Sequence, residues 1–264
     1  MSINPLFAPF RSVLGAAIKQ PGILLLTLAL LGGTGYAAAI FPRDAAAPPV
    51  NGQVQDATAL SPEQAKDFAA AWAQQNRVDL GVAPEGAKVV IVKFNDYQCG
   101  GCAATHVWYK PIFEKFAKSN PGAVKYVVKD WPWAMKCNAS LKPEMGAPEH
   151  PASCEAAAAV RIARAIGKAK ELEMQDFLFN NMRTLDPAAV KRAAEQMLGV
   201  KDFTTEYAKQ LAEIRKDVAQ GVALGISSTP TLFINGVRID GTQMMPAAYL
   251  DLAIQLELKR SAGK

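Results

Sequence analysis

The sequence is poor in residues that bind metals or covalently attached haem. Its 264 residues include only two histidines, His106 and His150, and four cysteines. It has no Cys-x-x-Cys-His motif, no second Cys-x-x-Cys and no His-x-x-x-His pair. These absences argue against attached haem and a structural zinc site, because both need such closely spaced ligands. We therefore expect no metal or other cofactor.

Long basic runs are also missing. The formal net charge is +5, and the lysines and arginines are spread along the chain without a cluster. Nucleic-acid binding depends on basic side chains gathered on one surface, so we expect no nucleic-acid partner. No internal repeat is present. The length is sufficient for one sizeable folded domain plus appendages.

Charge is absent between Lys19 and Arg43, and most of this segment is apolar. About 20 apolar residues in a helix match the roughly 30 Å hydrocarbon core of a bilayer. Arg11 and Lys19 precede the segment, so the positive-inside rule places residues 1–20 in the cytoplasm. We expect residues 21–41 to form a single-pass anchor in a bacterial inner membrane, with the C-terminal domain in the periplasm.

A cleavable signal peptide is the alternative for the same segment. Its strongly apolar part ends at Leu31, and Ala37-Ala38-Ala39 provides a small-residue cleavage site. Both interpretations export the folded part to an oxidising compartment, where disulfides form and persist. Residues 42–60, which include Ala-Ala-Ala-Pro-Pro, are expected to be an extended linker.

Residues 61–262 carry the patterns of one folded domain. Ser61-Pro62-Glu63-Gln64 is typical of a helix start with a capping box and a proline in the first turn. The Ala-rich stretch from 152 to 222 predicts several helices, with breaks near Gly167, Asp186-Pro187 and Gly199. We expect a helical insertion at about 140–222.

A βαβ unit is predicted around the first two cysteines. The β-branched run Val89–Phe94 is typical of a strand buried on both faces. It leads into Cys99-Gly-Gly-Cys102, a helix over 103–118 and a second strand over 124–129. The cysteine pair therefore lies where the first strand ends and a helix begins.

The C-terminal part of the domain predicts a hairpin and a last helix. Asn235-Gly236 separates the apolar runs 231–234 and 237–239, which is typical of a hairpin with a type I′ turn. A helix then begins near Pro246. Helical spacing predicts that one apolar face of this helix carries Tyr249, Leu252, Ala253 and Leu256.

The position of Cys99 and Cys102 predicts disulfide exchange. The thiolate is the nucleophile in this chemistry, and free N–H groups and the dipole at a helix start favour the thiolate. We expect Cys99 to attack and Cys102 to resolve the mixed disulfide. The Gly100-Gly101 spacer adds no histidine that would stabilise the thiolate. The sequence therefore does not separate an oxidase from a reductase or an isomerase.

Phe94-Asn-Asp-Tyr-Gln-Cys-Gly-Gly-Cys102 resembles the active-site segment of the DsbA-like branch of the thioredoxin superfamily. Ser228-Thr-Pro-Thr231 resembles the cis-proline loop of that branch. The resemblance covers about residues 60–260. It implies an α/β thioredoxin fold, in which helices flank a central mixed sheet and a helical domain is inserted. It also implies that Pro230 is cis beside Cys99 and that the Thr229 backbone pairs with substrate.

The resemblance implies a thiol–disulfide oxidoreductase that forms, reduces or shuffles disulfides in exported proteins. A membrane redox partner would then recycle the Cys99–Cys102 pair. The alternative is a thioredoxin-fold copper carrier that uses the same thiols, since soft thiolates suit Cu(I). His106 would be its third ligand.

Three residues near the cysteines have two interpretations each. Lys93 stands where the family often has an acidic residue, six positions before the first cysteine, and either stabilises the thiolate or points to solvent. Asp96 either forms a turn or accepts the proton of Cys102. His106 is either a polar helix residue or a group that tunes the thiols.

Cys137 and Cys154 form the second cysteine pair, and we expect a structural disulfide between them. Closing a loop of this size contributes about 3 kcal/mol in the chain-entropy account. The alternative is a pair that exchanges electrons with Cys99–Cys102. Tyr109, Trp131 and Trp133 are expected to pack in the core, with a place for Trp131 in an apolar peptide groove as the alternative.

Overall fold

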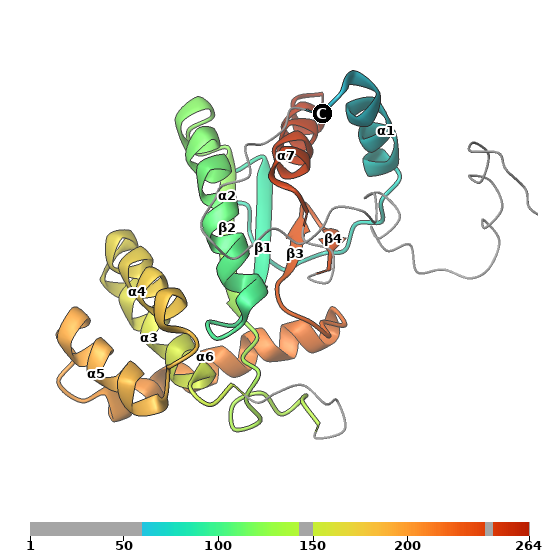
Figure 1. Cartoon of the computed structure of the whole chain (residues 1–264). Coiled ribbons are helices and arrows are strands. Elements are labelled where there is room, and N and C mark those ends of the chain that lie inside the picture. Colours follow the sequence, from blue (N-terminus) through green and yellow to red (C-terminus); the bar gives the residue numbers. More distant parts are fainter. Residues whose placement is uncertain (1–59, 143–149, 241–244, 264) are drawn as a thin grey trace, which may run out of the picture. The chain divides into compact units, whose positions relative to one another are not determined.

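The computed structural model describes residues 60–142, 150–240 and 245–263 (Figure 1). The predicted anchor, the N-terminus before it and the linker up to residue 59 lie outside the described residues. In the described ranges, no helix combines the length and the apolar character needed to cross a bilayer.

A four-stranded sheet lies at the centre, in the order β2-β1-β3-β4 (Figure 1). Strand β1 (Val89–Asn95) pairs in parallel with β2 (Val124–Asp130) and antiparallel with β3 (Thr231–Ile234). Strand β4 (Val237–Ile239) pairs antiparallel with β3. Every residue of β1 is buried. The mixed sheet and its fully buried central strand confirm the predicted fold class.

One face of the sheet is covered by α1 (Pro62–Ala73), α2 (Gly100–Ser119) and α7 (Ala247–Ala262). Helix α1 begins with the predicted capping box. The Ser61 hydroxyl accepts from the Gln64 N–H at 3.1 Å, and the Ser61 N–H donates to the Gln64 side chain at 2.9 Å. The cap gives a hydrogen-bond acceptor to two backbone N–H groups that the helix start would otherwise leave unpaired.

The buried face of helix α7 differs slightly from the face that the helical spacing of apolar residues predicts. Tyr249 and Ala253 are buried as predicted, whereas Leu252 and Leu256 are only partly buried. The buried face instead includes Glu257, whose carboxylate is paired with two arginines. A buried carboxylate needs such partners.

The tight turn between β3 and β4 has the predicted type I′ character. Asn235 has φ 45° and Gly236 has φ 84°, so both central residues lie in the left-handed region. A Cβ at Gly236 would stand 2.3 Å from the Val78 carbonyl oxygen. Glycine is therefore required there by close packing as well as by the turn.

Within the described ranges, four helices are inserted between β2 and β3: α3 (Ser153–Ile166), α4 (Lys168–Asn181), α5 (Pro187–Leu198) and α6 (Phe203–Ala223). Their boundaries fall at the predicted breaks. Helix α3 contacts each of the other three, and its many alanines allow this close approach (Figure 1). The insertion begins with the loop after β2, and its first helix starts later than the predicted limit of about 140.

A buried ion cluster joins the insertion to the sheet. Arg161 of α3 pairs with Asp130 at the end of β2 and with Asp217 of α6. Lys129 lies 2.8 Å from Asp217. Burial raises the pKa of Asp130 to about 6, although the Arg161 charge opposes this rise. The cluster fixes the strand that ends beside the cysteine pair.

Candidate active site

Cys99 is the N-cap of α2, directly after the turn that follows β1. Its side chain is partly buried, whereas Cys102, one turn further along, is 0% exposed. Both are free thiols in the structure. The helix start presents unpaired backbone N–H groups at Cys99. The two thiols therefore have the unequal exposure that an attacking and a resolving cysteine need.

The electrostatics of the pair separate the two thiols. The pKa of Cys99 is lowered to about 6, chiefly because the Cys102 thiol hydrogen-bonds its thiolate, and also because of hydrogen bonds from the Thr229 side chain and the Cys102 backbone. Burial opposes this lowering. The pKa of Cys102 is raised well above its usual value, first by burial and then by its bond to Cys99. At neutral pH the outer thiol is therefore a thiolate and the inner thiol keeps its proton.

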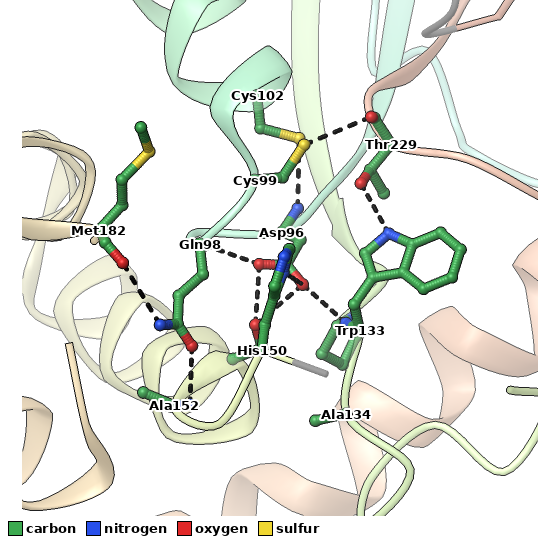
Figure 2. A network of polar contacts seen from close by, with 12 residues as sticks. Asp96, Gln98, Cys99, Cys102, Trp133, Ala134, His150, Ala152, Met182 and Thr229 are labelled. Carbon is green, nitrogen blue, oxygen red and sulfur yellow. Dashed lines mark hydrogen bonds and ion pairs between the residues drawn. The ribbon is translucent and has the colours of Figure 1, made fainter. Parts of the chain in front are cut away.

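The loop before β3 closes over Cys99. The Thr229–Pro230 peptide bond is cis, as the resemblance implies. The Cys99 Sγ lies 3.3 Å from the Thr229 carbonyl oxygen (Figure 2). A Cβ at Gly101 would stand 3.0 Å from the Pro230 Cδ. The second spacer glycine therefore lets the proline loop approach the helix start, a role that the sequence did not reveal.

Asp96 is the polar centre of the site. Its carboxylate is buried and accepts from the backbone N–H groups of Gln98 and Trp133, both at 2.6 Å. It also accepts from the Ser153 hydroxyl at 2.8 Å and lies 3.0 Å from the His150 Nδ1 (Figure 2). The bond to Gln98 N–H is that of an Asx turn. The carboxylate thus joins the turn before Cys99 to the loop after β2 and to α3.

The contact between Asp96 and Cys102 is not the one that a proton acceptor would make. Its backbone N–H, not its carboxylate, lies 3.4 Å from the Cys102 Sγ. Within the described residues, no hydrogen bond joins the Asp96 carboxylate to Cys102. The geometry favours the turn-forming interpretation.

The half-buried ring of His150 forms a hydrogen bond with the Asp96 carboxylate. Burial lowers the pKa of His150, but the hydrogen bond and the charge of Asp96 outweigh this effect and the net pKa is raised. The sequence predicted no role for His150. It enters the site through the loop after β2.

Lys93 lies beneath the cysteines. It is 2% exposed, and its Nζ donates to the Cys102 carbonyl oxygen at 3.1 Å. The interpretation that Lys93 points to solvent is therefore wrong. Its position in the middle of the buried strand β1 places its side chain against α2.

His106 faces the insertion. Its Nε2 lies 2.6 Å from the Asp176 Oδ1, and its ring packs 4.9 Å from that of Phe179. Burial lowers the pKa of His106 even though Asp176 raises it. No group of three His, Cys, Asp or Glu side chains in the described residues is arranged to hold a metal ion. The structure lends no support to the copper-carrier alternative.

The two tryptophans after β2 have different surroundings. Trp131 is 2% exposed and packs edge-on against Phe94, as expected, so the alternative that placed it in a peptide groove is wrong. Trp133 is partly exposed, and its indole N–H donates to the Thr229 hydroxyl at 2.8 Å (Figure 2). Trp133 therefore links the proline loop to Asp96. Tyr109 is in the core as predicted.

The positions of Trp133 and His150 follow from a signal that the sequence did contain. Strands β1 and β2 are parallel, so the residues after their carboxyl ends meet at the same edge of the sheet. The loop after β2 therefore had to approach Cys99.

Gln98 connects the cysteine turn to the insertion. Its Nε2 donates to the carbonyl oxygens of Met182 at 3.3 Å and Leu185 at 3.1 Å, and its Oε1 accepts from the Ala152 N–H at 2.7 Å (Figure 2). These bonds satisfy backbone groups at the end of α4 and at the start of α3. The sequence gave no signal for this role.

Cys137 and Cys154 form a disulfide with a Cα–Cα distance of 6.0 Å. Both residues are buried, at 2% and 0% exposure. The bond joins the loop after β2 to the first turn of α3. This burial supports the structural interpretation of the pair.

A cysteine pair at a helix start, placed after a buried strand and beside a cis-proline loop, is the arrangement of thioredoxin-fold proteins that exchange thiols and disulfides. Residues 79–249, more than half of the chain, match the family model described as thioredoxin, and the chain belongs to this family.

Solved structures give the same fold. Alpha-DsbA1 of Wolbachia pipientis is 16% identical, with a TM-score of 0.52 over 67% of this chain and 89% of its own. A linker-deletion variant of ScsC from Proteus mirabilis is 21% identical, with a TM-score of 0.49 over 74% of this chain and 81% of its own. At 16% identity, the similarity to alpha-DsbA1 shows the fold, including the helical insertion. A comparison with curated proteins found no match.

Proposed function

We propose that this protein is a thiol–disulfide oxidoreductase that acts on exported proteins through Cys99 and Cys102. The observation that carries the proposal is the unequal pair. Cys99 is partly exposed and has a pKa lowered to about 6, and Cys102 is fully buried behind it. Because the thiolate is the attacking species, this pair is prepared for exchange at neutral pH.

Each exchange reaction transfers two electrons in two steps. When the protein oxidises a substrate, a substrate thiolate attacks the Cys99 sulfur of the disulfide, and the Cys102 sulfur leaves and takes up a proton. A second substrate thiolate then attacks the substrate sulfur of the mixed disulfide and releases Cys99 as a thiolate. In the reverse direction, Cys99 attacks a substrate disulfide and Cys102 loses its proton and resolves the product.

The proline loop supports binding of an extended substrate segment. The Thr229 carbonyl oxygen lies 3.3 Å from Cys99 Sγ, so this backbone stands beside the reacting sulfur. An extended peptide that pairs with the Thr229 backbone would bring its own cysteine to Cys99. We assign Thr229 and Pro230 to substrate binding on this basis.

The second cysteine pair is consistent with an oxidising compartment. The Cys137–Cys154 disulfide supports export, since structural disulfides are rare in reducing compartments. We propose that residues 21–41 anchor the protein in the bacterial inner membrane and that residues 61–262 form the periplasmic domain. A membrane redox partner would recycle Cys99–Cys102 after each reaction.

Trapping of mixed disulfides tests the proposal. In Cys102→Ala, Cys99 still attacks but the product is not resolved, so exported proteins should accumulate as adducts that reducing agent releases. Cys99→Ala is the matched control and should trap none. If Cys102→Ala forms no adducts while Cys99→Ala retains dithiol exchange, the assignment is wrong.

The reduction potential of the pair then decides the direction of exchange. Potentials in this class extend from about −270 mV for thioredoxin, a reductant, to about −120 mV for DsbA, an oxidant. Equilibration with glutathione measures the value for this pair.

A further inference from the structure

Lys93 is a buried cation next to the active-site thiols. It is 2% exposed and ranks among the largest fully buried side chains of the protein. Its Nζ donates to the Cys102 carbonyl oxygen at 3.1 Å and lies 5.7 Å from the centre of the Phe179 ring. In the part of the chain that the structure describes, Lys93 forms no ion pair with a carboxylate. An ammonium group without an anion is costly to bury.

Among the residues that the structure describes, the groups that face Lys93 leave only the thiols as a source of negative charge. Helix α2 contributes Cys99, Cys102 and His106, and the imidazole of His106 is bonded to Asp176 of α4. On β2, the residue opposite Lys93 is the apolar Val128. The residue opposite Lys93 on β3 is an apolar leucine.

Burial lowers the pKa of Lys93, and the charges that oppose this lowering are those of Cys102 and Cys99. The carboxylate of Asp96 is not free to serve as the missing anion. It is already bonded to two backbone N–H groups, a serine hydroxyl and an imidazole. The charge balance around Lys93 therefore depends on the oxidation state of the pair.

The two oxidation states differ in the partner that they offer to Lys93. The reduced pair carries one thiolate at neutral pH, because Cys99 is ionised and Cys102 is not. The oxidised pair has a neutral S–S bond and no negative charge. A positive charge next to the pair therefore stabilises the reduced state relative to the oxidised state.

We propose that Lys93 is a positioning residue that holds the negative charge of the reduced Cys99–Cys102 pair and thereby makes this pair a stronger oxidant of substrate thiols. The proposal rests on the proposed function. In the reaction, a substrate dithiol gives two electrons to the Cys99–Cys102 disulfide and loses two protons. One proton goes to the Cys102 sulfur and the other to solvent, and the Cys99 sulfur remains a thiolate beside Lys93.

Lys93→Met tests the proposal, because methionine fills a similar volume without charge. In equilibrium with glutathione at pH 7, the ratio of reduced to oxidised pair should fall about fivefold in Lys93→Met, which corresponds to about 20 mV. The pKa of Cys99, followed by thiolate absorbance, should rise by about one unit. Lys110→Met is the matched control. It removes the same charge from an exposed site on α2, and both quantities should stay at the wild-type value.

The outcomes separate this inference from the proposed function. If the wild-type protein does not exchange with glutathione at all, the proposed function fails. If it exchanges and Lys93→Met equals Lys110→Met in both potential and thiolate pKa, the role of Lys93 is refuted. A structural role alone would change the stability of the variant without moving the thiolate pKa.

A second measurement needs no variant. Protein with 13C-labelled lysine reports the titration of Lys93 through its Cε resonance in the oxidised and the reduced state. The pKa of Lys93 should be higher in the reduced protein, where a thiolate is present. Equal pKa values in the two states would overturn the proposal.

Discussion

The hydrogen bond from Cys102 to Cys99 gives a prediction that can be worked through in numbers. The pKa of Cys99 falls from 9.0 to about 6. This shift of about three units corresponds to about 4 kcal/mol of preference for the thiolate. At pH 7 about nine-tenths of Cys99 is then ionised, against about one-hundredth for a thiol of pKa 9.

The perturbation is Cys102→Ala, which removes the largest contribution to this lowering. A hydrogen bond to a charged group contributes about 1.5–3 kcal/mol. The pKa of Cys99 should therefore rise by about one to two units. The assay is the rate of alkylation by iodoacetamide between pH 4 and pH 10, with thiolate absorbance as a second signal. Thr229→Val should give a smaller rise, because its side chain contributes less.

The same shift makes the stability of the reduced protein depend on pH. The pKa of Cys99 is lower in the folded state, so its contribution is fully present above the unfolded pKa and is lost as pH falls through about 6. Relative to that of the oxidised protein, the free energy of unfolding of the reduced protein should rise by about 1.4 kcal/mol between pH 5 and pH 7, and by more up to pH 9. An unchanged alkylation profile in Cys102→Ala would refute this account and assign the lowering of the Cys99 pKa to the helix start and Thr229.

Three further predictions concern contacts around the site. Arg161→Met leaves the buried Asp130 without its ion-pair partner and Asp217 with Lys129 alone, and it should destabilise the protein by about 3–5 kcal/mol in urea unfolding, while Arg161→Lys should lose less. Gly221→Ala places a methyl group 2.3 Å from the Trp131 ring and should cost at least about 1–3 kcal/mol, read as a lower midpoint of thermal unfolding; a wild-type midpoint would contradict the packing. Trp133→Phe removes the indole bond to Thr229 and should raise the KM for a cysteine-containing peptide with little change in the Cys99 pKa, whereas a large pKa change would show that Trp133 acts on the thiol itself.

Local signals in the sequence were enough to predict the frame of the site. The run Val89–Phe94, the cysteine pair and the helix after it are neighbours in the chain, so their order alone places Cys99 at a helix start. Asn235-Gly236 fixed its hairpin in the same way, because both residues tolerate positive φ. The cis bond before Pro230 came from the family resemblance, since a Thr-Pro pair by itself indicates only a turn.

Contacts between distant segments were beyond such signals. Whether Lys93 meets solvent or the thiols depends on α2 covering that face of the sheet, and strand periodicity does not say which helix covers which face. Trp131 and Trp133 are two residues apart and end in different environments, because Trp131 directly follows β2 and packs against Phe94, whereas Trp133 contacts the proline loop. The bonds of Gln98 need the ends of α3 and α4 in place, which only the folded insertion supplies.

The glycine pair between the thiols has a consequence for the choice of substrate. Gly100 is exposed and Gly101 lies under Pro230, so the protein offers a bare stretch of main chain between the two sulfurs. An incoming polypeptide meets no side chain there that would favour one neighbouring amino acid over another. Selection among substrate proteins must then come from the residues around the cysteine pair, such as Trp133 and Met182, and from the accessibility of the cysteines in each substrate. Replacing the exposed Gly100 by a larger residue would be a direct way to narrow the range of substrate proteins without displacing Pro230.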